Sequence, residues 1–262
     1  AVMLASAREL VFGLLIVGLA VVFGWRMLLP PAPPRSIAVV WFFGSDDLTV
    51  PALPRRARDR ERLIEVFRER VDPSATADDP GKESFERRVL DPSLRPEDGL
   101  IVYLSGQGTV VDDRPMLVGD GFDPFGGERG RASGRLDLVE LLGTVARSSA
   151  GTKFVLIDAG DRLADPAFWP PAPDSLDRIG RADFAPRLMA SVDAIGDPTL
   201  TVVVSHDVDQ LARFDPTGGS LFAQAIETTL LPSDDPDAAG GVAIDSRQLA
   251  ERIASMTAAR LP

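Results

Sequence analysis

The sequence contains no cysteine and a single histidine, His206, among its 262 residues. The absence of cysteine excludes disulfide bonds, thiolate metal sites and every mechanism in which a cysteine is the nucleophile. One histidine is too few for a multi-histidine metal centre, and any Ser-His-Asp triad would have to use His206. A chain without thiols is compatible with either redox compartment. Few kinds of catalysis remain open to it.

Basic residues are also scarce relative to acidic ones. The chain has 28 Lys and Arg against 39 Asp and Glu, which gives a net charge of −11. Because phosphate binding needs clustered Lys and Arg, this excess of acid argues against a nucleic-acid partner. Hydrophobic residues make up 45% of the chain, enough to bury a core.

One long apolar run lies near the start of the sequence, from Val11 to Trp25, and contains no charge. A membrane-spanning helix needs about 20 mostly apolar residues, and Arg26 beside Trp25 suits a membrane interface. We therefore expect a single-pass anchor over residues 1–29. Its marker residues are Val11, Leu15, Leu19, Val22, Trp25 and Arg26. The alternatives are a buried soluble helix and a cleaved signal peptide, although no small-x-small cleavage site follows the run.

A proline-rich stretch over residues 30–35 follows the apolar run and predicts a stiff, extended tether. Positive charge is nearly balanced across the anchor, with Arg8 and the amino terminus on one side and Arg26 and Arg35 on the other. The positive-inside rule therefore favours a cytoplasmic position for residues 36–262 only slightly.

Short apolar runs alternate with amphipathic segments through residues 36–262. The predicted buried strands begin at Ser36 and cover Leu100–Leu104, Lys153–Asp158 and Leu200–Ser205. The predicted helices cover 55–71, the segment after a capping box of Asp137 and Glu140, 221–229 and 246–256. Residues 72–83 predict a loop. This alternation predicts an α/β fold with helices on both faces of a mostly parallel sheet, where ligands bind at the carboxyl ends of strands.

The stretch "LIVYLSGQGTVVDD" from Leu100 breaks from an apolar run into Ser105-Gly106-Gln107-Gly108. Glycines on both sides of a polar residue at a strand end suggest that its side chain is held over a pocket. A dinucleotide-binding loop does not fit, because Val111 stands where the third glycine is required and a strand-like segment follows.

Two other patterns carry weaker signals. Asp112, Asp113, Asp120 and Asp123 could gather around calcium, but their spacing matches no EF-hand loop, so acidic turns are the better interpretation. His206 follows a predicted strand, and a strand-end histidine is a better interpretation than a catalytic base.

Taken in order, five segments resemble the caspase-like peptidase family, which comprises caspases, metacaspases and their bacterial relatives. The segments are "GLIVYLSGQGTVVDDRPMLVGDGFDP", "LDLVELLGTV", "KFVLIDAGD", "TVVVSHDVDQLARFDPTGGSLFAQAIETTL" and "GGVAIDSRQLAERI". In that family one strand ends in Ser-Gly-His-Gly, and a later strand ends in Asp-Ala-Cys or Asp-Cys-Cys. The resemblance runs from about Ser36 to the C-terminus. It implies a caspase-like domain over 36–262, a three-layer α/β/α sandwich with a mostly parallel central sheet.

Carried over residue by residue, the resemblance puts Gln107 at the family's histidine, Gly108 at its oxyanion glycine and Gly160 at its cysteine. An amide has no useful pKa and glycine has no side chain, so neither member of the catalytic dyad is present. The resemblance thus implies no catalytic residue, and we expect neither a metal nor a cofactor. The degenerate pocket would comprise Ser105, Gly106, Gln107, Gly108, Asp158, Ala159 and Gly160.

These inferences predict a membrane-anchored pseudopeptidase that acts as a scaffold or assembly subunit. Its expected partners are the lipid bilayer and other protein subunits or a second copy, since caspase-like domains can pair through an edge strand. One alternative is a peptide-binding sensor or regulator of an active caspase-like partner, with Arg187 and Arg213 as candidate pocket arginines. Another is a non-cysteine hydrolase that uses Ser105 or Asp161 with His206.

Overall fold

The computed structural model describes most of the region after the proline-rich stretch over residues 30–35. The described residues are 33–43, 56–71, 77–78, 81–119, 122, 134–160, 179–180, 184–205, 214–215, 219–230, 251 and 255. The chain divides into two units, Ala1–Pro34 and Arg35–Pro262, and the described helices and strands belong to the second. The expected anchor over residues 1–29 lies outside the described residues. Within them, no helix has the length and apolar character needed to cross a membrane.

A mixed sheet of eight strands forms the centre of the described structure. Its parallel part has the order β2 (Ala77–Asp78), β1 (Ser36–Phe42), β3 (Gly99–Val111), β6 (Thr152–Gly160), β8 (Leu200–Val204). The antiparallel strands are β4 (Arg114–Val118), β5 (Arg135–Asp137) and β7 (Ile179–Gly180), and a separate pair is formed by β9 (Phe214–Asp215) and β10 (Gly219–Ser220). The expected α/β class with a mostly parallel centre is confirmed.

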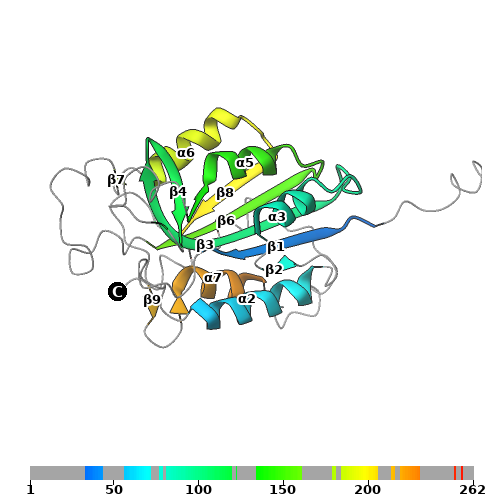
Figure 1. Cartoon of the computed structure of the whole chain (residues 1–262). Helices are drawn as coiled ribbons and strands as arrows, with labels where there is room; N and C mark the ends of the chain where they lie inside the picture. Colours follow the sequence, from blue (N-terminus) through cyan, green and yellow to red (C-terminus); the bar gives the residue numbers. More distant parts are fainter. Residues whose placement is uncertain are drawn as a thin grey trace, which may run out of the picture. The chain divides into compact units, whose positions relative to one another are not determined.

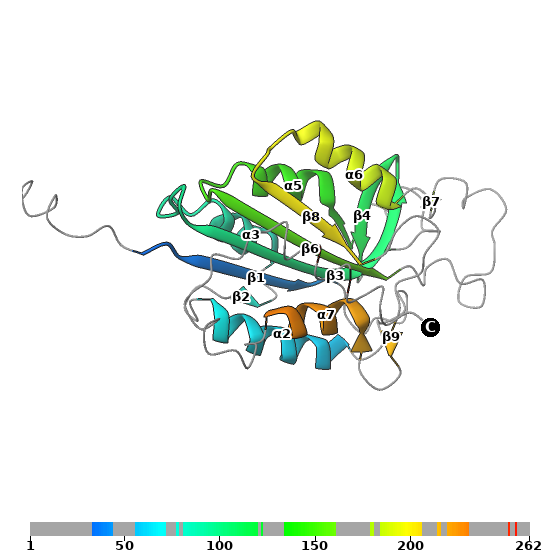
Figure 2. The ribbon, with the colours of Figure 1, turned by 180° about the vertical axis from the view of Figure 1, so that it is seen from behind.

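Helices cover both faces of the sheet (Figures 1 and 2). One face carries α3 (Gly81–Val89), α5 (Leu138–Ala146) and α6 (Phe184–Ile195), and the other carries α2 (Arg56–Arg70) and α7 (Leu221–Leu230). Neighbouring strand residues point to opposite cores: Val102 packs with the first set of helices, and Tyr103 with the second. Burial on both faces explains why the parallel strands are continuous apolar runs in the sequence.

Several local signals in the sequence are confirmed. Leu63, Ile64 and Phe67 are buried on α2, as their helical spacing predicts. Asp137 caps α5, and its Oδ1 accepts hydrogen bonds from the backbone N–H groups of Val139 and Glu140, at 2.9 and 3.1 Å.

Two predicted boundaries are wrong. In the stretch 72–83 predicted as a loop, residues 77–78 form β2, and residues 81–83 belong to α3 because Phe85 and Val89, one turn apart, are buried against the sheet. The buried strand does not end at Leu104: β3 loses its partner β1 after Ser105 but pairs antiparallel with β4 from Gln107 onward. Asp112 and Asp113 form the tight turn of this hairpin, with φ of 50° and 65°.

Three further expectations have different outcomes. The segment from Leu200, expected to be fully buried, is half-buried along most of β8. Helix α6 has no counterpart among the predicted elements. The helix expected over 246–256 lies outside the described residues except for Glu251 and Ser255, both of which are helical.

Candidate functional site

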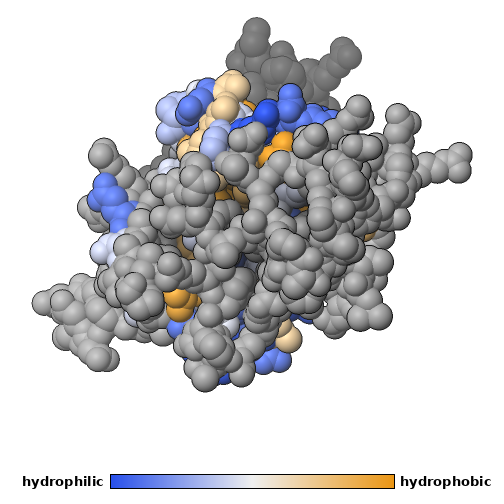
Figure 3. All heavy atoms as spheres, turned by 90° about the vertical axis from the view of Figure 1, so that its left-hand side faces the viewer, coloured by the Kyte–Doolittle hydropathy of each residue, from blue (hydrophilic) through white to orange (hydrophobic). Residues whose placement is uncertain are grey.

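Strands β3 and β6 bring the two motifs singled out in the sequence side by side. Ser105 lies opposite Asp158, Gly106 opposite Ala159, and Gln107 opposite Gly160. The pairing is parallel, so these residues occupy the carboxyl-terminal part of both strands. Strands β3 and β6 run toward the left-hand side of Figure 1, the side that faces the viewer in Figure 3. Gln107 and Gly160, the two positions to which the expected resemblance assigns a histidine and a cysteine, are thus direct neighbours across two strands.

The pleat of the sheet divides these residues between its two faces. Gly106, Gly108 and Ala159 lie on the face covered by α3, α5 and α6. Ser105, Gln107 and Asp158 follow the alternation of Tyr103 and Leu156 and lie on the face covered by α2 and α7. Ser105 and Gln107 are buried, with 3% and 2% of their surface exposed. The glutamine is therefore part of a strand interior and does not project into solvent.

The glycine after Gln107 has a packing role. A Cβ atom at Gly108 would lie 3.0 Å from the Ala159 Cβ and 3.1 Å from the Phe184 Cζ. Phe184 is the first residue of α6 and is buried. The missing side chain at Gly108 therefore lets the start of α6 approach the sheet closely.

A buried hydrogen bond connects the two strands beside this position. The Tyr103 hydroxyl donates to Asp158 Oδ2 at 3.0 Å, and both residues are almost fully buried. Burial and the nearby Asp158 carboxylate raise the pKa of the Tyr103 phenol well above its ordinary value. Tyr103 therefore keeps its proton near neutral pH and acts as a hydrogen-bond donor.

A second buried acid, Asp59 on α2, was missed in the sequence. It is 4% exposed, and its Oδ2 accepts a hydrogen bond from the Ser220 backbone N–H at 3.0 Å. The pKa of Asp59 is raised from 3.8 to about 7, chiefly by burial; the Ser220 N–H works against this rise and the charge of Asp158 adds to it. The signal was present, because Asp59 precedes Leu63 by four residues and Phe67 by eight on the apolar stripe of the helix.

The end of β6 is also held by the residue after β8. The Ser205 Oγ accepts a hydrogen bond from the Ala159 N–H at 3.2 Å, and the Ser205 N–H donates to the Ile157 carbonyl at 2.9 Å. These contacts fix the backbone immediately before Gly160.

The residues considered for other functions are placed only in part. Ser105 is buried, which gives no support to a role as an accessible nucleophile. Arg187 on α6 pairs with Asp113 in the β3–β4 turn, with 3.1 Å between the guanidinium and carboxylate. His206, Asp161, Arg213, Asp120 and Asp123 lie outside the described residues. Among those described, no cluster of three or more His, Cys, Asp or Glu side chains could hold a metal ion.

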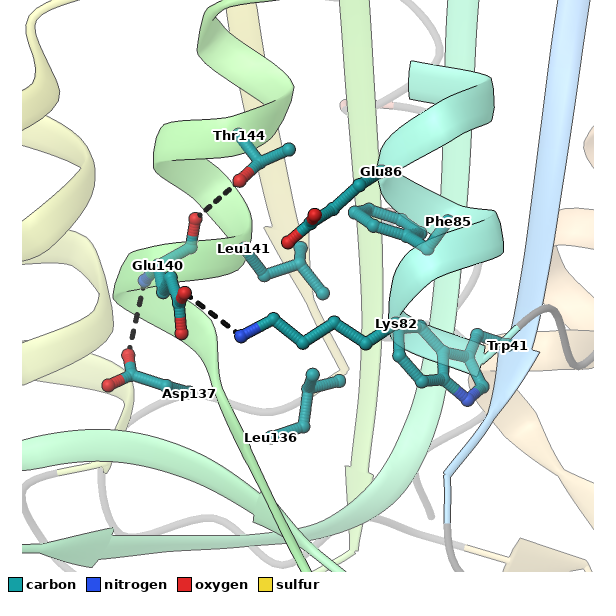
Figure 4. Close-up of a pocket in the computed structure, with 9 residues that line it drawn as sticks. All are labelled: Trp41, Lys82, Phe85, Glu86, Leu136, Asp137, Glu140, Leu141 and Thr144. Carbon is teal, nitrogen blue, oxygen red and sulfur yellow. Dashed lines mark hydrogen bonds and ion pairs between the residues drawn. The ribbon is translucent and has the colours of Figure 1, made fainter. Parts of the chain in front are cut away.

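A small pocket lies between α3 and α5, on the face of the sheet opposite to Ser105, Gln107 and Asp158 (Figure 4). Apolar side chains that include Trp41 and Phe85 line it, and the Lys82 Nζ and Glu140 Oε1 form an exposed ion pair of 2.9 Å beside it. In a complete capping box, the Glu140 carboxylate would accept a hydrogen bond from the Asp137 backbone N–H. Here that carboxylate forms an ion pair with Lys82 instead. The cavity is small, about 20 Å³.

The part of the chain that the structure describes thus contains a buried polar site on β3, β6, α2 and β10. Ser105, the candidate nucleophile within it, is shielded from solvent. No protein-family model matches the sequence, and no curated protein matches it closely enough to count as a relative.

Proposed function

We propose that this chain is a catalytically inactive relative of the caspase-like peptidases and serves as a scaffold or assembly subunit of a membrane-associated complex. The observation that carries the proposal is the pairing of Gln107 with Gly160 on adjacent parallel strands. The resemblance assigns a histidine and a cysteine to these two positions, and such a dyad has to be adjacent to transfer a proton.

The chemistry of the paired residues supports inactivity. A cysteine peptidase needs a thiolate as nucleophile and an imidazole that exchanges a proton with it. Gln107 offers only a neutral amide, Gly160 offers no side chain, and the sequence contains no cysteine that could substitute. The fold and the tight backbone of the site would then be retained for assembly.

The outer strand of the sheet supports a role in assembly. Strand β8 pairs with β6 on one side, and no strand within the described ranges pairs with its other side. Val202, Val203 and Val204 remain partly exposed there. An exposed strand edge of this kind accepts a further strand from another chain. The membrane location rests on the predicted anchor.

The positions of the lost dyad can be tested by restoring its chemistry. In the double variant Gln107→His, Gly160→Cys, the new imidazole should stabilise the thiolate, so we expect the pKa of the only thiol to fall by at least about one unit relative to Gly160→Cys alone. The pH dependence of iodoacetamide alkylation, followed by mass spectrometry, measures this pKa.

The control is Thr152→Cys with Gln107→His, because Thr152 is exposed at the opposite end of β6. The thiol of that variant should have a pKa near 8.5 with either residue at 107. If the thiol pKa of Gly160→Cys is the same whether residue 107 is histidine or glutamine, positions 107 and 160 do not have the geometry of a dyad. The caspase-like interpretation then loses its main support.

A further inference from the structure

The carboxyl group of Asp59 joins three elements at one buried point. It projects from α2, its Oδ2 accepts the Ser220 backbone N–H, and Ser220 immediately precedes α7. The Ser220 Oγ in turn accepts a hydrogen bond from the Ala223 N–H at 3.3 Å, which caps the first turn of α7. Asp59 therefore holds the capped start of α7 against α2.

The other carboxylate oxygen has a different environment. Asp59 Oδ1 is buried and makes no hydrogen bond with any described residue. It lies against Gly219, where an added Cβ would collide with it, and Gly219 has a φ of +93° that favours glycine. An ionised carboxylate in this position leaves one charged oxygen without a donor among the described groups, which is costly in a buried site.

Some of the charges around Asp59 add to the cost of ionising it, and others reduce that cost. The Asp158 carboxylate at the end of β6 repels an ionised Asp59, and the Tyr103 hydroxyl on β3 already donates to Asp158. Arg58 and Arg62 on α2 attract the ionised form. Arg62 is shared with Glu227 of α7, at 3.4 Å, so its charge is partly neutralised.

We propose that Asp59 is a proton-binding site that makes the junction between α2 and the start of α7 sensitive to pH. With a proton on Asp59, the repulsion from Asp158 disappears and the junction is tight. Loss of that proton places two negative charges in one apolar core, and the start of α7 opens to let water reach them. The junction borders the face on which Ser105, Gln107 and Asp158 lie.

The direction of the pH effect follows from proton linkage. Burial raises the pKa of Asp59 from 3.8 to about 7, so the folded protein binds the proton more tightly than the unfolded chain does. The contribution of this group to the free energy of unfolding therefore falls as the pH rises from about 4 to about 7, and it stays low above that range. Most acids in proteins act in the opposite direction.

Hydrogen exchange of the 262-residue chain in mild detergent tests the proposal. Protection of the amides at 220–226, corrected for intrinsic exchange rates, should fall at least about tenfold between about pH 5.5 and about pH 8. The amides of α5, on the opposite face, should lose much less. In Asp59→Asn the pH dependence at 220–226 should disappear, and protection at pH 8 should exceed that of the wild-type chain.

Two further variants separate titration from a structural role. Glu65→Gln removes an exposed acid from the same helix and should leave the wild-type profile unchanged. Asp158→Asn removes the repulsion, so the midpoint of the transition should move to lower pH, a shift that a structural contact would not produce. A flat wild-type profile, or the same profile in Asp59→Asn, would overturn the proposal. If Asp59→Asn fails to fold, an unmoved midpoint in Asp158→Asn decides against it.

Discussion

Gly108 has two possible reasons to be a glycine. Its backbone N–H could serve as the remnant of an oxyanion site, or its missing side chain could admit Phe184. The contacts of 3.0 Å to Ala159 and 3.1 Å to Phe184 that a Cβ would make argue for packing. We therefore predict that Gly108→Ala lowers the free energy of unfolding by about 1–3 kcal/mol, as overpacked cores do, measured by urea denaturation.

The matched control is Gly143→Ala in α5. A Cβ at Gly143 meets nothing within 4 Å, and alanine has the higher helix propensity, so this variant should gain about 0.5–1 kcal/mol. Adding Phe184→Leu to Gly108→Ala should recover part of the loss by making room. If Gly108→Ala is as stable as the wild-type chain, close packing of α6 is not what requires glycine there.

At the scale of single residues, the sequence showed part of the site. Gln107, Gly160 and Asp158 stood out because they end apolar runs, and parallel strands that are neighbours bring such ends together. Tyr103 and Asp59 did not stand out in the sequence, because the role of each depends on buried groups that come from other segments of the chain. Their segments meet only through the packing of α2 and α7 on the sheet, which no local pattern encodes.

At the scale of helices and strands, the start of β6 is held in place by one buried charge, that of Lys153. Lys153 is 5% exposed, and its Nζ donates to the Ala146 carbonyl, Asp197 Oδ2 and Thr199 Oγ1, at 3.0, 2.8 and 3.1 Å. It thereby ties the end of α5 and the turn before β8 to the sheet. Lys153→Met should cost about 3 kcal/mol, because the largely buried Asp197 carboxylate (16% exposed) loses its counter-ion.

Urea denaturation of Lys153→Met beside Lys82→Met checks this prediction. The Lys82–Glu140 pair has a similar length, 2.9 Å, but both side chains are more than half exposed, so its loss should cost less than about 1 kcal/mol. Equal losses in the two variants would show that burial does not set the strength of these ion pairs.

The elements that the sequence predicted well have strong local signals. Helix α2 has an apolar stripe, α5 has its Asp137 cap, and β6 is an apolar run. The extension of β3 past Ser105 was not predictable in the same way, because it depends on β4 replacing β1 as partner. Helix α3 was hidden by the Pro80-Gly81 turn signal directly before it, although Phe85 and Val89 have helical spacing.

At the scale of the whole molecule, the layered α/β architecture could be predicted from the alternation of apolar runs and amphipathic segments. Which strands form the edges of the sheet, and how exposed they are, could not. The edge formed by β2 has only two residues, which limits its pairing with another chain. The edge formed by β8 has five, and Val202 to Val204 are partly exposed. The outer strand β5, at the far side of β4, has three residues. If the chain assembles through strand pairing, β8 is therefore the best candidate among the described outer strands.

The hydrogen bonds of β8 show how to test this edge without unfolding the sheet. The Ser205 N–H donates to the Ile157 carbonyl of β6, so alternation turns the N–H groups of Val203 and Thr201 toward β6 and that of Val202 away from it. Val202→Pro removes an outward donor and a valine side chain that packs at the edge of the core, and it leaves the inward hydrogen bonds to β6 in place. We predict that the wild-type chain in mild detergent is larger than a monomer by light scattering and that Val202→Pro is a folded monomer.

Val203→Pro is the control, because it removes an inward donor and should destabilise the sheet by about 3 kcal/mol or more. Circular dichroism and urea denaturation separate this loss of stability from a change in assembly. A wild-type chain that is a strict monomer would contradict self-association itself. Val202→Pro with the assembly state of the wild-type chain would move the contact away from β8, because an edge that pairs with a second copy must respond to the removal of its outward hydrogen-bond donor.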